Sequence, residues 1–152
     1  MTIVTPNFAA DLSTSREVAD PITELLRVHA RTLIQSALEV EVECVLAELR
    51  QGGAHVVRNG HLPERLVTTA VGDVAVSVPR IRSRDGHNVN FASTMIPRYL
   101  RRSASIDAWT CYAYLRGVSE ADIAGVLEVV LGEGAKKVTP AVLLGLKKAW
   151  TS

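Results

Sequence analysis

Three arginines occupy alternate positions in the stretch VPRIRSRDG, namely Arg80, Arg82 and Arg84. In an extended strand alternate side chains point to the same face, so this spacing predicts a row of three guanidinium groups. A guanidinium group is always charged, and its planar fork matches the oxygens of phosphates and carboxylates. The pattern favours binding of an external polyanion, and nucleic-acid phosphate is the natural candidate.

The distribution of charge supports this interpretation. The chain has 152 residues and a net charge of +1, but residues 1–50 carry a net −4 and residues 51–102 a net +5. The basic residues of this middle segment are all arginine: Arg58, Arg65, Arg80, Arg82, Arg84, Arg98, Arg101 and Arg102. The alternative is a solvated sheet edge, since edge strands often carry charge that prevents aggregation.

No constellation of residues predicts catalysis or a metal site. The histidines and cysteines lack the spacing of zinc ligands, and neither standard glycine-rich phosphate loop occurs. Glu39 and Glu43 could share a helix face while Glu41 points away, which leaves two carboxylates without a third ligand. We expect these acids to lie on a solvated or partner-facing surface, and we predict no catalytic residue, metal or cofactor in this chain.

A long amphipathic helix is predicted after a loose tail at residues 1–19. Asp20-Pro21 is typical of an N-cap followed by proline at the first helical position. Apolar residues then recur at helical spacing until the glycine pair at 52–53 ends the helix.

The segment that carries the arginines is predicted to form a small antiparallel sheet. Residues 58–65 are rich in turn formers, and residues 66–79 alternate like a β-hairpin with Gly72-Asp73 at its centre. Pro79 should end a strand or mark a sheet edge. Residues 89–95 are expected to add a short strand.

Three helices are predicted in the last third, capped by Ser105, Ser119 and Thr139. Their order is that of a helix-turn-helix unit. At the start of the last helix only Thr139 can hydrogen-bond through its side chain, and capping should occupy it. This helix therefore looks more like a core or interface helix than a base-reading one, although Lys147 and Lys148 could touch phosphate. The predicted fold class is α+β.

Several motifs in order resemble the N-terminal, DNA-binding portion of Mutator-type bacterial insertion-sequence transposases. The resemblance runs from about residue 25 to Trp150. It rests on RNGHLPERLVTTAVGDVAVSVPRIRSRDG, on IPRYLRRSASIDAWTCYAYLRGVSEADIAGVLEVVLG and on VTPAVLLGLKKAW. It implies binding of double-stranded DNA at the terminal inverted repeats of the element.

The resemblance also implies a catalytic domain of RNase H-like fold, in which three acidic residues and two divalent metal ions cut and join DNA. The chain stops at Ser152, where that domain would begin, and none of its acids matches the catalytic triad. We therefore expect a catalytically incomplete chain, truncated before that domain, that does not cut DNA by itself.

The sequence thus predicts a flexible tail (1–19), a helix with an arginine-rich hairpin (20–102) and a helix-turn-helix-like region (103–152). The expected DNA contacts are Arg58, Arg80, Arg82, Arg84, Arg98, Arg101, Arg102, Lys147 and Lys148. Without a signal peptide or a membrane-spanning run, the chain is expected in the bacterial cytoplasm, associated with the nucleoid. The alternative function is a protein-interaction module that pairs through residues 22–50 and the last helix, and that could inhibit an intact transposase.

Overall fold

The computed structural model describes residues 20–132, 135 and 138–152, and in this part the chain has the predicted α+β fold. The elements are α2 (Pro21–Gln51), β1 (Val56–His61), β2 (Arg65–Thr69), β3 (Gly72–Val76), β4 (Pro79–Ser83), α3 (Ala104–Leu115), α4 (Glu120–Leu131) and α5 (Pro140–Thr151). The predicted tail at 1–19 lies outside the described residues.

The long helix α2 begins and ends as predicted. The Asp20 carboxylate accepts a hydrogen bond from the backbone N–H of Ile22 at 3.0 Å, and Pro21 occupies the first turn. Gly52 follows the last helical residue. Only one stripe of the helix is buried, at Leu38, Val42 and Leu46.

The hairpin β2–β3 is confirmed, but its turn lies two residues earlier than predicted. Thr69 pairs with Gly72, so Ala70 and Val71 form the turn, whereas Gly72-Asp73 opens β3. Gly72 has φ of +100°, a backbone conformation that residues with a Cβ rarely adopt. Alternation along β3 buries Val74 and Val76 as the spacing requires.

The second sheet pairs β1 with β4, and the segment 58–65 predicted to be rich in turns is a loop only at 62–64, because residues 58–61 belong to β1. Arg58 pairs with Ile81 and His61 with Pro79, so Asn59 and Gly60 together oppose Arg80. This is a β-bulge, which absorbs turn-forming residues without ending the strand. Pro79 begins β4 in a two-stranded sheet, consistent with the predicted edge position.

The strand expected at residues 89–95 does not form. This described segment is a loop that packs along α2. Phe91 is half-buried against the α2–sheet core. The Glu41 carboxylate accepts hydrogen bonds from the Ser93 hydroxyl and from the Thr94 backbone N–H and hydroxyl. Side chains of α2, rather than a neighbouring strand, therefore fix this segment.

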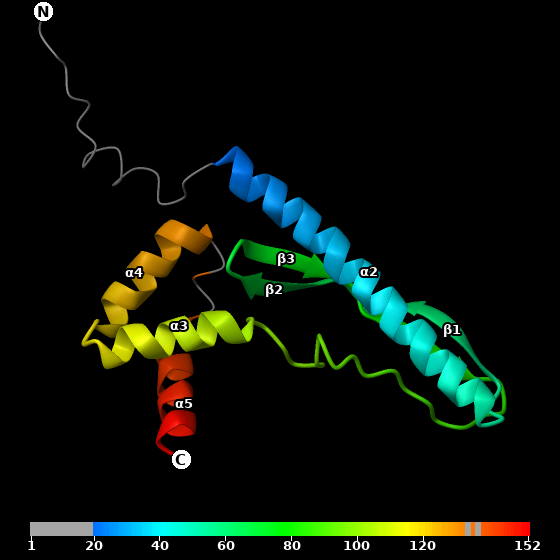
Figure 1. Cartoon of the computed structure of the whole chain (residues 1–152). Coiled ribbons are helices and arrows are strands. Elements are labelled where there is room, and N and C mark those ends of the chain that lie inside the picture. The colour runs from blue at the N-terminus through cyan, green and yellow to red at the C-terminus, as the bar shows by residue number, and fades with distance from the viewer. Residues whose placement is uncertain (1–19, 133–134, 136–137) are drawn as a thin grey trace, which may run out of the picture.

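Helix α2 is the shared support of both sheets. Figure 1 shows it passing over β2 and β3 and then running beside β1 toward its C-terminal end. Leu38 packs with valines of β2 and β3, whereas Val42 and Leu46 pack with Val56 and Ile81 of the β1–β4 sheet. The position of β4 is therefore set by the C-terminal half of α2.

The three C-terminal helices enclose a core of their own around Ile123, Leu127 and Leu143. Ser119 caps α4 as predicted, accepting from the Asp122 N–H at 3.2 Å. Ser103 rather than Ser105 occupies the N-cap of α3, so that helix begins two residues before the predicted start. Thr139 occupies the N-cap of α5, but its side chain makes no capping hydrogen bond, contrary to the prediction.

Candidate nucleic-acid interface

The alternating arginines lie on the outer face of the β1–β4 sheet. In β4 the side chains of Pro79 and Ile81 are buried, whereas Arg80 and Arg82 are exposed. Arg84 is exposed just beyond the strand. The side chains of these three arginines form no hydrogen bond or ion pair with any described residue. The predicted shared face is confirmed for Arg80 and Arg82, while Arg84 is exposed just beyond the end of β4.

Arg84 also lines an open cavity of about 560 Å³ at the C-terminal end of α2. Arg50 lines the same cavity and donates from its Nε to the Val56 carbonyl at 3.2 Å. Sequence reasoning missed Arg50; its place in the last turn of α2, beside the glycine pair, was the available signal. Arg50 and Arg84 therefore line the same cavity, at the end of the arginine row.

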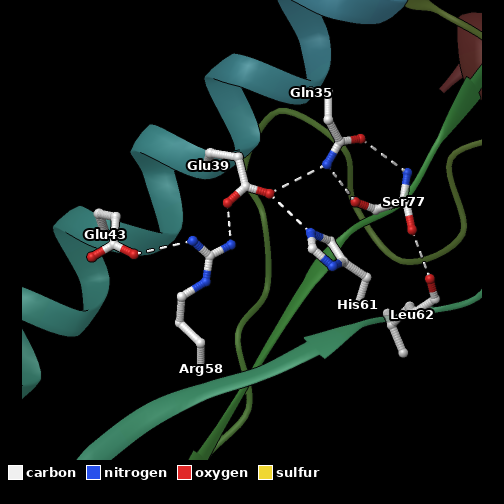
Figure 2. Close-up of polar contacts among 7 residues, drawn as sticks. All are labelled: Gln35, Glu39, Glu43, Arg58, His61, Leu62 and Ser77. Carbon is white, nitrogen blue, oxygen red and sulfur yellow. Dashed lines mark hydrogen bonds and ion pairs between the residues drawn. The ribbon is translucent and has the colours of Figure 1, made fainter.

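Arg58, by contrast, lies on the opposite face of the sheet. It pairs with Ile81, whose side chain is buried toward α2, and its guanidinium group reaches Glu39 and Glu43 on that helix. Figure 2 shows the side chain extending from the strand to a position between the two carboxylates. Arg58 therefore links β1 to α2 and lies on the face of the sheet away from Arg80 and Arg82.

The acids expected on a solvated or partner-facing surface are intramolecular partners instead. His61 Nε2 lies 2.9 Å from Glu39, and Gln35 hydrogen-bonds the backbone of Ser77 at the β3–β4 corner (Figure 2). The hydrogen bond from His61, with a further contribution from Arg58, lowers the pKa of Glu39 despite partial burial. These contacts hold the sheet against α2 on the face away from Arg80 and Arg82.

Glu41 plays a similar part on the other side of α2. Burial alone would raise the pKa of Glu41, but hydrogen bonds donated by Ser93 and Thr94 lower it below its ordinary value. The carboxylate thus stays charged while it anchors the loop that connects the sheet to α3.

The second arginine cluster is only partly available. Arg98 is exposed and lies 5.8 Å from the ring centroid of Tyr99, itself 84% exposed. Arg101 is exposed as well, whereas Arg102 is largely buried and donates to Asp107 at 2.8 Å. Arg65, which the site prediction left out, is a structural residue that donates to the carbonyls of Pro97 and Leu100, each at 2.7 Å.

The two lysines of α5 lie apart from the arginine row. Lys147 donates to the Tyr114 hydroxyl at 3.2 Å, and Lys148 is exposed. Figure 1 shows α5 beyond α3, at the opposite side of the molecule from β1. The residues predicted to touch DNA therefore form three separate groups rather than one patch.

A comparison with protein families decides the ancestry of this chain. The model of the family described as "Transposase, Mutator family" matches residues 3–144. The chain belongs to the Mutator family of transposases. No curated protein matches the sequence of this Mutator-family chain. The family resemblance drawn from sequence motifs is thereby confirmed.

In this Mutator-family protein the two ends of the first motif that carried the resemblance form one sheet. The triplet Arg58-Asn59-Gly60 lies in the bulged part of β1, and Pro79–Ser83 forms β4, its partner strand. Within the described part of the chain, no three histidine, cysteine, aspartate or glutamate residues gather as they would around a metal ion. None of the described helices combines the length and apolarity needed to cross a membrane.

Proposed function

We propose that this Mutator-family chain binds DNA through the outer face of its β1–β4 sheet, at the terminal inverted repeats of an insertion sequence. The observation that carries the proposal is that Arg80 and Arg82 on one face of β4, and Arg84 just beyond it, are exposed and have no partner among the described residues. By contrast, Arg58, Arg65 and Arg102 each donate to other residues of the chain. Unpaired guanidinium groups are free to neutralise phosphates and release condensed counterions.

The remaining contacts are of two kinds. Arg98 and Arg101 are exposed and can extend the phosphate-binding surface, and Lys147 and Lys148 can add contacts from α5. Arg58 and Arg102 are left out of this direct set because their side chains hold the fold together. DNA binding of this kind also places the protein at the bacterial nucleoid.

Fluorescence anisotropy across a salt series tests the proposal. The labelled duplex carries the terminal repeat of a related insertion sequence, with a shuffled duplex beside it. Each phosphate contact contributes about 0.9 to the slope of log affinity against log salt, so replacing Arg80, Arg82 and Arg84 by alanine should lower the slope by up to about 2.7. Arg116→Ala, an exposed arginine at the end of α3, is the matched control. An unchanged slope in the triple variant would overturn the proposal.

We also propose that the isolated chain does not cleave DNA, because none of its acids matches the family's catalytic residues. Incubation of an end-containing duplex with pure protein and Mg²⁺ should leave both strands intact. Nicking that co-purifies with the protein through successive columns would contradict this.

A second candidate function is pairing with another copy of the chain or with an intact transposase, through which this protein could inhibit transposition. One observation favours it: Leu26, Leu33 and Val40 of α2 are 52%, 70% and 64% exposed. Their spacing of seven residues places them along one side of the helix, the pattern of a helix–helix seam.

A further inference from the structure

The outer face of the β1–β4 sheet carries more than positive charge. Antiparallel pairing sets Val57 beside Arg82 on this face, and the bulge sets Asn59 beside Arg80. The Asn59 side chain makes no hydrogen bond with any described residue. One strand thus presents two arginines, and its neighbour presents an amide and an aliphatic group.

A simple phosphate clamp does not account for this composition. Phosphate oxygens are bound by cationic groups and hydrogen-bond donors, whereas the Val57 side chain has neither a charge nor a hydrogen-bond donor. The same four side chains match the edges of bases in the major groove. Arginine binds the O6 and N7 of guanine through two hydrogen bonds, asparagine binds the N6 and N7 of adenine, and an aliphatic group contacts the thymine methyl.

The dimensions of the sheet fit the same groove. The major groove is about 12 Å wide and admits a two-stranded β-ribbon. Alternate residues of a strand lie about 6.8 Å apart, close to twice the rise of about 3.4 Å per base pair. Arg80 and Arg82 can therefore address bases two pairs apart along the duplex, while Asn59 and Val57 address the neighbouring positions.

The inner face gives the ribbon the rigidity that base reading needs. Val56 and Ile81 are buried against α2, and Arg58 ties β1 to two carboxylates of that helix. Side chains on an element supported in this way are held more precisely than side chains on a loop.

The C-terminal helices offer a weaker alternative. After Thr139, helix α5 begins with Pro140, Ala141 and Val142, none of which has a side chain that can hydrogen-bond a base edge. Its apolar start fits packing better than base reading.

We infer that the β1–β4 sheet reads base sequence in the major groove, with Arg80, Arg82, Asn59 and Val57 as the specificity-determining residues. This inference rests on the proposed DNA binding and deepens it. Guanines lie opposite the two arginines, adenine opposite Asn59 and thymine opposite Val57, while Arg84 and Arg50 border the cavity where the flanking phosphate lies.

The experiment begins with the whole chain and a pool of random-sequence duplexes, from which bound DNA is enriched and sequenced. The enriched site is then remade with 7-deazaguanine, which lacks the major-groove N7, or with inosine, which lacks the minor-groove amino group. We expect 7-deazaguanine at a contacted position to weaken binding about fivefold, as for one lost hydrogen bond. Inosine should leave the affinity nearly unchanged.

Two conservative variants separate base reading from charge. Arg82→Lys keeps the charge but loses the fork, and Asn59→Ala removes the amide. Each should reduce the ratio of affinities for the enriched site and a scrambled duplex by roughly 5- to 150-fold, the range for one bidentate base contact. Affinity for the scrambled duplex should change little. Arg116→Lys is the control, and unchanged circular dichroism confirms that the variants fold.

The outcomes distinguish this inference from the function on which it rests. If the wild-type chain binds no duplex, both fail. If it binds without enriching any sequence, DNA binding stands and base reading by the sheet is overturned. Sensitivity to inosine rather than to 7-deazaguanine, or specificity unaffected in both variants, would overturn it as well.

Discussion

At the scale of single residues, neighbours rather than residue type decide what an arginine does. Arg58 and Arg82 lie on adjacent strands, yet one faces two carboxylates of α2 and the other has no partner among the described residues. The sequence shows both as arginines of a basic segment. Only the pairing of β1 with β4 reveals that they point to opposite faces.

This contrast predicts that Arg58→Ala and Arg82→Ala have complementary effects. Partly exposed ion pairs contribute about 0.2–1 kcal/mol each, so Arg58→Ala should lower the free energy of unfolding by about 1 kcal/mol. Arg82→Ala should change it by less than about 0.5 kcal/mol but weaken DNA binding more. Urea unfolding and anisotropy measure the two quantities. If Arg58→Ala weakens binding as much as Arg82→Ala at equal stability, the structural role assigned to Arg58 is wrong.

The carboxylate that Arg58 contacts should make stability depend on pH. The pKa of Glu39 in the folded chain is lower than its ordinary value of 4.5, chiefly because His61 hydrogen-bonds the charged form. A lowered carboxylate pKa stabilises the fold fully above about pH 4.5, and this contribution disappears as pH falls through the folded-state pKa. The stability difference between wild type and Glu39→Gln should therefore be constant above about pH 4.5 and shrink as the pH falls through the folded-state pKa of Glu39.

Urea unfolding at a series of pH values checks this. Glu48→Gln removes a carboxylate of the same helix that forms no hydrogen bond or ion pair with any described residue, and it serves as the control for general charge effects. A stability difference between wild type and Glu39→Gln that stays constant across the range would contradict the prediction.

At the scale of elements, the features set by local sequence could be predicted and those set by distant pairing could not. Asp20, Ser119 and the glycine pair at 52–53 mark helix ends through contacts within a few residues. Strand β1 depends on pairing with β4, more than 15 residues away, and its Asn-Gly pair imitates a turn. The arginine row could therefore be predicted from the sequence. The neighbouring strand β1, and the face of the sheet on which Arg58 lies, could not.

The turn of the β2–β3 hairpin allows a test at this scale. A Cβ added to Gly72 would lie 2.8 Å from the Arg27 guanidinium group, and φ at this position is +100°. Gly72→Ala should therefore destabilise the fold by about 1–2 kcal/mol through backbone strain alone. Gly125 lies within α4 with nothing within 4 Å of an added Cβ, so Gly125→Ala should stabilise by about 0.5–1 kcal/mol.

Thermal and urea unfolding of the two variants give the comparison. The pair is informative because the same chemical change is expected to have opposite signs. Equal stability of wild type and Gly72→Ala would mean that the turn relaxes to another conformation at no cost.

At the scale of the whole molecule, the described chain leaves two different surfaces exposed, the arginines of β4 and apolar residues of α2. The sheet turns its inner face to α2 and its arginines outward, and the C-terminal helices enclose a separate core. On α2 itself Leu26, Leu33 and Val40, on the side of the helix away from the buried stripe, remain exposed. Sequence periodicity grouped all of them as one amphipathic pattern, because it cannot tell a stripe covered by the sheet from one left open.

The open stripe gives a prediction about assembly. Burying a leucine or valine side chain contributes about 1.5–3 kcal/mol, so a seam built on Leu26, Leu33 and Val40 from two chains can support a dimer. The wild-type chain should show concentration-dependent mass in size-exclusion chromatography with light scattering. The double variant Leu33→Asp/Val40→Asp should remain a folded monomer, since both positions are exposed.

Val42 supplies the control, because it lies two residues from Val40 but is fully buried. Val42→Asp places a charge in the core and should unfold the chain, whereas the double variant should keep the helical circular dichroism of the wild type. If both proteins unfold, the stripe belongs to the fold and not to an interface. A wild type that stays monomeric at every concentration would exclude pairing with itself, and binding of a labelled chain to an intact Mutator-family transposase would then test the remaining partner.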